Sequence, residues 1–431
     1  MSERGKALME AATRQLREAM DLFGRMTEAD LRKPCHDEGG DGAGDTVGAA
    51  GRHLADGYGR LGGLVRGAAD GPAAHQAGQH DGSVTHGGGH DGAPGPANLA
   101  DLLGDLTRAN DQISRLGDLT DERLDSVLDP ATSRFSDGKR TLEQVIGVAL
   151  SHQAEHLSTL RQAVAAGQVE VPGARLYYET HGDGPLLVMV PGAGGTADVF
   201  RMVAAHLAAH YTVVIYDRRG FSRSRLAGPQ DYDRRLQTDA DDVRRLIGHL
   251  GGDDSATVFG ASSGAIVGLE TLARHPEAVR TLVPYEPPAL GQLPDGKEWE
   301  TFFSGVYDLY RSSGIEPAFE AFRERTFAEI DRRTMARAPR NDANAAYWFE
   351  HELRQYPPAE LDLDALTQHA DRILPAAGRE SHGYPCYEAI GRLGERLGLG
   401  VIELPGGHTG FLSHAAEFAE ELARHLTARN A

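Results

Sequence analysis

The hydrophobic pattern of the 431-residue chain changes near residue 167. Before this point apolar residues recur every three or four positions, as they do on amphipathic helices. After it, short apolar runs alternate with helical stretches, an order that produces a mostly parallel sheet covered by helices. A chain of this length is also too long for one ordinary core. We therefore expect a multi-domain protein, with an all-α domain over residues 1–166 and an α/β domain over residues 173–431.

Four amphipathic helices are expected in the first domain. They begin near Lys6, after Thr46, after Asn98 and at the sequence TLEQ. In TLEQ, Thr141 and Gln144 can satisfy each other's main-chain groups in a capping box. Four helices of this length favour a four-helix bundle.

A stretch rich in glycine and histidine separates the second and third helices. It has almost no large apolar side chains, so burial cannot offset the entropy lost on ordering it. We interpret it as a flexible insertion over residues 67–97. Its four histidines could chelate a metal ion weakly, but a solvated loop is the preferred interpretation.

Charge and cysteine content restrict the class of partner. Lys and Arg number 44 against 63 Asp and Glu, giving a net charge of −19 that repels nucleic acid and anionic lipid. No apolar run approaches the roughly 20 residues that span a bilayer, and the first residues lack the apolar stretch of a secretory signal. Cys35 and Cys386 lie far apart, which argues against a disulfide framework. We expect a cytoplasmic protein with a small-molecule substrate and no nucleic acid or membrane partner. The sequence does not decide the oligomeric state, and a homo-oligomer stays open.

The stretch VFGASSG fits the nucleophile-elbow pattern G-x-S-x-G, with Gly260, Ser262 and Gly264. It follows a short apolar run and precedes a helical stretch, which is the strand-to-helix context that this motif requires. Ser263 offers a second frame, because Ala261 and Ala265 are also small. Ser262 is favoured, since it comes two residues after the glycine that closes the strand.

A serine nucleophile needs a histidine base and an acid, in the chain order serine, acid, histidine. His408 follows the last expected strand and is favoured over His414, which begins a helical run. Two carboxylates remain open for the acid. Glu286 ends the strand after the nucleophile, whereas Glu380 follows the next strand, where the acid more usually lies. We favour Glu286 slightly.

Two further segments complete the expected catalytic domain. The glycine-rich PGAGG follows an apolar strand, and the N–H groups of Ala193 and Ser263 are the expected donors of an oxyanion hole. No lysine follows these glycines as a phosphate-binding loop would require. The stretch over about 287–370 looks helical, holds both tryptophans and is interpreted as a lid.

The expected strands RLYYET and LLVMV are joined by HGDGP, a link short enough for an antiparallel hairpin.

Residues from about 173 to 431 resemble the α/β-hydrolase superfamily in its capped, esterase-like form. The motifs are PGAGG, YDRRGFSRS, GASSG and GGHTGF, in the order found in that family. In such proteins the segment with Asp217, Arg218 and Gly220 shapes the fold and does no chemistry. The resemblance implies attack of Ser262 on a small ester, thioester or lactone through a covalent acyl-enzyme, with no cofactor in this domain.

Three histidines of the first domain are expected to point inward. His152 and His156 are four residues apart on one helix face, and His53 lies on the inward stripe of the second helix. Three converging imidazoles can bind a divalent metal ion and leave a position open for water or substrate. The alternative is that each is a core histidine hydrogen-bonded to a neighbour.

Residues 1–166 resemble the DinB-like four-helix metal-binding family, on GDTVGAAGRHLADGY and RTLEQVIGVALSHQAEHL. The resemblance carries the family's metal triad onto His53, His152 and His156, with zinc, nickel or iron as the expected ion. Some relatives are thiol-dependent transferases or isomerases. Two alternatives to a hydrolase therefore stand: metal- and thiol-dependent chemistry in the bundle with an accessory hydrolase, and a non-catalytic small-molecule binding or sensing module.

Overall fold

The computed structural model describes residues 2–35, 46–70, 98–251, 255–338 and 341–430. They divide into two compact units, Met1–Ala165 and Ala166–Ala431. Most of the His-rich insertion lies outside the described residues, and residues 67–70, predicted to belong to it, continue a helix instead. Within the described ranges, no helix has both the length and the apolar character needed to cross a bilayer.

The first unit is helical. Its four long helices share one apolar core, to which Leu16, Leu54, Leu106 and Leu160 contribute from successive helices. The capping box forms as expected, because Thr141 N donates to Gln144 Oε1 over 3.0 Å and Gln144 N donates to Thr141 Oγ1 over 3.3 Å. The elements are α1 (Glu3–Gly24), η1 (Asp30–Arg32), α2 (Val47–Asp70), α3 (Leu99–Ile113), η3 (Ser114–Asp118), α4 (Asp121–Leu124) and α5 (Leu142–Ala165).

The second unit is built on one sheet in the order β1-β2-β4-β3-β6-β7-β8-β9, with β5 paired to β2. The pairs from β4 to β9 along this order are parallel, and those made by β2 are antiparallel. The strands are β1 (Ala166–Val171), β2 (Ala174–His181), β3 (Leu186–Val190), β4 (Thr212–Tyr216), β5 (Arg225–Leu226), β6 (Ala256–Ala261), β7 (Val279–Tyr285), β8 (Ala376–Gly378) and β9 (Ile402–Leu404).

Two details of the sequence analysis are wrong. β2 and β3 form no hairpin: β2 pairs with β4, and β3 lies on the other side of β4. The chain crosses over through α6 (Arg201–Leu207), so β3 and β4 are parallel. As a result β4 lies between β2 and β3, the two strands that the short link HGDGP joins. The α/β unit also starts earlier than residue 173, because β1 follows α5 without a break and pairs with β2. Within β1, only Val169 and Val171 alternate as buried apolar residues, so the sequence pattern gives little indication of this strand.

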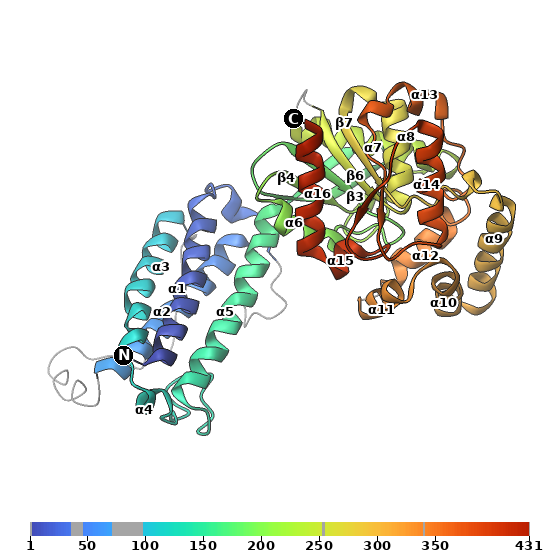
Figure 1. The fold of residues 1–431 in the computed structure, drawn as a ribbon. Coiled ribbons are helices and arrows are strands. Elements are labelled where there is room, and N and C mark those ends of the chain that lie inside the picture. The colour runs from blue at the N-terminus through green and yellow to red at the C-terminus, as the bar shows by residue number, and fades with distance from the viewer. Residues whose placement is uncertain (1, 36–45, 71–97, 252–254, 339–340, 431) are drawn as a thin grey trace. The chain divides into compact units, whose positions relative to one another are not determined.

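Helices cover both faces of the sheet (Figure 1). Alternate strand residues point to opposite faces: Val188 and Val258 pack with α7, α8 and α14, whereas Met189 and Phe259 pack with α6 and α16. The bounds are η4 (Ala197–Phe200), α6 (Arg201–Leu207), η5 (Tyr232–Arg234), α7 (Arg235–Gly251), α8 (Ser263–Arg274), η6 (Pro276–Ala278), α14 (Pro385–Leu397), α15 (Gly410–Ser413) and α16 (Ala415–Asn430).

A helical cap lies between β7 and β8, in the stretch expected to form a lid (Figure 1). Its aromatic side chains, among them Trp299, Phe322 and Trp348, join the core on one face of the sheet. The stacked rings of Phe319 and Trp348 connect two of its helices. The cap contains η7 (Leu290–Gln292), α9 (Gly296–Ser313), α10 (Ile315–Thr326), α11 (Glu329–Arg337), α12 (Asp342–His351), α13 (Leu363–Gln368) and η8 (Ala370–Arg372).

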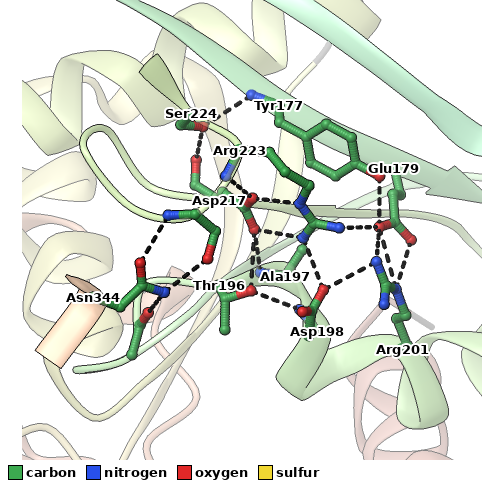
Figure 2. A network of polar contacts seen from close by, with 12 residues as sticks. Tyr177, Glu179, Thr196, Ala197, Asp198, Arg201, Asp217, Arg223, Ser224 and Asn344 are labelled. Carbon is green, nitrogen blue, oxygen red and sulfur yellow. Dashed lines mark hydrogen bonds and ion pairs between the residues drawn. The ribbon is translucent and has the colours of Figure 1, made fainter. Parts of the chain in front are cut away.

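Buried carboxylates hold the loops at the ends of β3 and β4 (Figure 2). Asp217 accepts from the main-chain N–H groups of Ala197 and Arg223 at 2.8 and 2.9 Å. Glu179 of β2 is fully buried and pairs with Arg201 at 2.7 Å. Burial opposes ionisation of Glu179, but the neighbouring side chains of His181 and Arg201 outweigh it and lower its pKa to about 2. Glu179 is therefore a buried negative charge that helps to hold these loops through Arg201.

We predict that Glu179→Gln destabilises the second unit at pH 7 by on the order of 3 kcal/mol, because each pKa unit is worth about 1.4 kcal/mol. A lowered pKa adds stability above the unfolded value of about 4.5, and this stability is lost as the pH falls toward 2. The difference between wild type and variant should therefore shrink below pH 4.5. Urea unfolding, monitored by tryptophan fluorescence, measures this difference in stability, since Trp299 and Trp348 both lie in this unit. Glu170→Gln, on an exposed pair with Arg175, is the control; equal behaviour of the two variants would contradict the prediction.

Candidate active site

Ser262 occupies the sharp turn between β6 and α8. Its φ is 54° and its ψ is −124°, a conformation that is strained for a residue with a side chain. Its N–H donates to Tyr285 O over 2.9 Å, and its carbonyl accepts from Ala265 N at 2.8 Å. Only two other non-glycine residues of the described chain have a positive φ, Ser222 and Glu286. Such strain concentrates where function requires it.

The two glycines of the elbow are required by close approach of the main chain. A Cβ on Gly260 would lie 2.3 Å from Gly264 O, and one on Gly264 would lie 2.1 Å from Val190 O. Real Cβ atoms do not approach a carbonyl oxygen so closely. The small residues at these positions therefore let α8 start directly against β3 and β6.

His408 follows β9 and contacts Glu286, which directly follows β7. The two atoms in contact are His408 Nδ1 and Glu286 Oε2, 2.6 Å apart. Both side chains are buried, and the second carboxylate oxygen accepts from Gly378 N at 2.7 Å. An ionised carboxylate can accept hydrogen bonds but cannot donate them. The contact therefore assigns the imidazole proton to Nδ1 and leaves Nε2 as the basic nitrogen.

The other candidates for these roles lie elsewhere. The alternative acid, Glu380, is exposed, and its main-chain N–H donates to Gly406 O. His414 directly follows α15, and its Nδ1 contacts the hydroxyl of Ser413. Glu286 takes the place beside His408 because β7 is the neighbour of β6, and its end lies closer to the elbow than the turn after β8. Ser263 is the first residue of α8 and is almost fully buried.

A cavity of about 290 Å³ joins the predicted catalytic groups. Ser262, His408, Ala193 and Ser263 all line it. The glycine-rich loop PGAGG after β3 approaches the turn at Ser262, since a Cβ on Gly192 would lie 3.0 Å from Ser262 Cβ. Within the described residues, neither Ala193 N–H nor Ser263 N–H donates to a protein acceptor. Both are therefore available to an oxygen atom in the cavity.

The cavity wall is mostly apolar and comes largely from the cap. Phe303, Phe322, Phe327 and Trp348 contribute to it, and no Asp, Glu or Lys among the described residues does. Arg323 is the one lining side chain with a permanent charge. Its guanidinium pairs with Glu316 of the same helix at 3.1 Å. The space therefore suits a small, largely apolar molecule without a positive charge.

Cys386 also lines the cavity, at the start of α14. Burial raises the pKa of its thiol well above the ordinary value, and the nearby carboxylates of Glu286 and Asp331 add to this. Only the thiolate is strongly nucleophilic. The raised pKa of this thiol therefore argues against Cys386 as a nucleophile in this cavity.

Three polar residues of the cap contact the site and carry no sequence motif. Asn344 Nδ2 donates to Gly194 O in the oxyanion loop at 3.0 Å (Figure 2). Glu352 pairs with Arg218 at 2.6 Å, and Arg218 also donates to Gly192 O at 3.0 Å. Asp331 accepts from the main chain of His408. Isolated Asn, Asp and Glu residues in a helical stretch give no signal, so only the fold reveals them.

The three histidines of the first unit do converge. His152 Nε2 and His156 Nε2 are 3.0 Å apart, and one nitrogen of each of the three rings lies within 4.8 Å of the others. Burial, and then the neighbouring His156, lowers the pKa of His152, which favours the neutral form that binds metal. Arg134 also contacts His152 Nε2, so its guanidinium would have to move away from a bound ion. The donor set and its spacing fit a divalent metal ion.

Comparison with known proteins identifies the second unit. The model of the alpha/beta hydrolase family matches residues 187–421. The chain is 39% identical over 264 residues to the uncharacterized hydrolase YraK of Bacillus subtilis (strain 168), covering 59% of this chain and 94% of YraK.

Two further similarities extend this result. Polyketide synthase ThaQ of Burkholderia thailandensis is 28% identical over 365 residues, covering 75% of this chain and 17% of ThaQ, so the match reaches beyond the second unit. A thermophilic esterase from Thermogutta terrifontis has the same fold, with a TM-score of 0.50 at 18% identity over 62% of this chain and 100% of the esterase. The chain belongs to the α/β-hydrolase family and is a hydrolase.

Proposed function

We propose that the second unit is a serine hydrolase that cleaves a small ester, thioester or lactone through a covalent acyl-enzyme. One observation carries the proposal: Ser262 and His408 line the same cavity, and Glu286 contacts the far nitrogen of that imidazole. This is the arrangement of nucleophile, base and orienting acid that activates a serine hydroxyl.

In the first half of the reaction, Ser262 Oγ attacks the substrate carbonyl while His408 Nε2 accepts the hydroxyl proton. Glu286 stabilises the imidazolium through Nδ1–H. Negative charge develops on the carbonyl oxygen, and the N–H groups of Ala193 and Ser263 stabilise it. The carbonyl then reforms, the bond to the alcohol or thiol breaks, and His408 returns its proton to the leaving group.

In the second half, a water molecule attacks the acyl-enzyme while His408 Nε2 accepts a proton from it. The same two N–H groups stabilise the second tetrahedral intermediate. Its collapse releases the carboxylic acid and returns the proton to Ser262 Oγ. For a lactone, the leaving hydroxyl stays attached to the acyl chain, so a single hydroxy acid is released.

The cavity restricts the substrate. Its volume of about 290 Å³ and its aromatic wall suit a short, apolar acyl or alkyl group. Arg323 and the absence of acidic lining residues among those described disfavour a cationic substrate. Short neutral esters are therefore the expected substrates.

A second candidate function concerns the first unit, and the convergence of His53, His152 and His156 favours it. We propose that these residues hold a divalent metal ion, with zinc, nickel or iron as candidates. Bound there, the ion would act as a Lewis acid toward water or a thiol. A thiol-dependent transferase or isomerase activity would use this site, with the hydrolase acting on a related compound.

We predict that Ser262→Ala lowers kcat/KM for p-nitrophenyl butyrate by at least about 10³-fold and abolishes labelling by a fluorophosphonate, because the nucleophile is gone. Butyrate should be cleaved faster than dodecanoate. Ser263→Ala should still be labelled, since its main-chain N–H is kept. Labelling that survives in Ser262→Ala would move the nucleophile elsewhere.

For the acid, Glu286→Gln should lower kcat by about 10²–10⁴-fold, because it removes the charge that orients and stabilises His408. Glu380→Gln is the matched control, a carboxylate after the next strand that is exposed to solvent. It should behave as wild type. Steady-state kinetics of both variants on p-nitrophenyl butyrate distinguish them, and similar small losses in both would refute the role of Glu286.

For the metal site, protein purified without an affinity tag should contain about one equivalent of divalent metal that His156→Ala loses. Replacing His75, His80, His86 and His90 of the insertion should leave the content unchanged. Elemental analysis by mass spectrometry measures both. Retention of metal in His156→Ala, with loss in the insertion variant, would assign the ion to the insertion.

A further inference from the structure

A carboxylate of the cap holds the loop that carries His408. Asp331 lies in the first turn of α11 and is almost fully buried. Its Oδ2 accepts from His408 N at 3.0 Å, and its Oδ1 accepts from both the N–H and the hydroxyl of Thr409 at 2.7 Å. Three donors of two successive residues thus converge on one side chain that is distant in sequence.

Stability alone accounts poorly for this arrangement. Burying a carboxylate is costly unless it is paired and hydrogen-bonded. Among the described residues no lysine or arginine forms an ion pair with Asp331; its partners are neutral N–H and O–H groups. What the three bonds do specify is the position of the main chain at His408.

The cap contacts the imidazole as well as its main chain. Phe327, one turn before Asp331, places its ring 4.6 Å from the ring of His408 at an interplanar angle of 34°. Glu286 holds Nδ1 from the sheet. The histidine is therefore fixed from three directions, two of which come from the cap.

The sequence of the histidine loop is adapted to this carboxylate. A Cβ on Gly407 would lie 2.3 Å from Asp331 Oδ2. The second glycine of GGHTGF is thus the residue that lets the carboxylate reach the N–H of His408. A side chain at residue 407 and the observed position of Asp331 exclude each other.

We propose that Asp331 is a positioning residue: it fixes the main chain of His408 and Thr409, so that the cap is part of the catalytic apparatus and does more than cover it. The proposal rests on the role proposed above for His408. Asp331 acts through the histidine and not on the substrate. Its loss should therefore slow the chemical step and leave substrate binding almost unchanged, because misplacement of a catalytic group by about 1 Å can cost 10²-fold in rate.

The test is steady-state kinetics of Asp331→Ala on p-nitrophenyl butyrate, together with the rate of labelling by a fluorophosphonate. We expect kcat to fall about 10- to 100-fold and the labelling rate to fall in parallel, with KM within about twofold of wild type. Glu329→Gln, an exposed acid on the same helix, is the control for charge and should match wild type.

Two substitutions of Thr409 give a milder version of the experiment, in case urea unfolding shows that Asp331→Ala does not fold. Thr409→Val removes one of the three donors and keeps both N–H groups, so kcat should fall by about 3- to 10-fold. Thr409→Ser restores the hydroxyl and should recover the wild-type rate.

The outcomes separate the two proposals. If Asp331→Ala folds and keeps the wild-type kcat, the role of Asp331 is overturned. If Asp331→Ala does not fold, a wild-type kcat in Thr409→Val overturns it. A rise in KM without a fall in kcat also overturns it, since that would mean substrate contact. Ser262→Ala is run beside them: if it keeps wild-type activity, the proposed serine mechanism fails, whatever the cap variants do.

Discussion

The main-chain conformation of Ser262 is the constraint on which the active site depends. A positive φ at a residue with a side chain costs about 1–3 kcal/mol, and hydrogen bonds to the ends of neighbouring elements hold it. Ser262 N donates to Tyr285 O, and the next residue, Glu286, has a positive φ of its own and donates from its N–H to Ala376 O. The ends of β6, β7 and β8 therefore hold the positive φ of Ser262, and they also fix the position of Glu286, whose carboxylate contacts His408.

Much of the fold follows from local pattern. Periodic apolar residues and the Thr141–Gln144 box suffice to place the helices of the first unit, because each signal acts within a few residues. Pairing of strands is not local. β2 and β3 are joined by a short link and yet are separated by β4, since a crossover elsewhere in the chain decides which strand fills the space between them.

Some residues of the candidate site are likewise indicated by a local pattern, whereas others are brought together only by the fold. Ser262 and His408 stand in short motifs with glycines at fixed offsets, so the sequence alone indicates them as candidates. The choice between Glu286 and Glu380 depends on which strand end lies nearer the elbow, and that requires the sheet order. Asp331 and Asn344 carry no local signal, because their partners are 77 and 150 residues away in the chain.

The attachment of the cap has a consequence for how molecules enter and leave. Glu352, Asn344 and Asp331 join it to the main body around the cavity. Separating a buried charged pair alone costs about 3–5 kcal/mol, so a hinge motion of the whole cap, which would break all three contacts, is disfavoured. Entry and exit of small molecules are therefore expected to involve movement of parts of the cap and not of the cap as a whole.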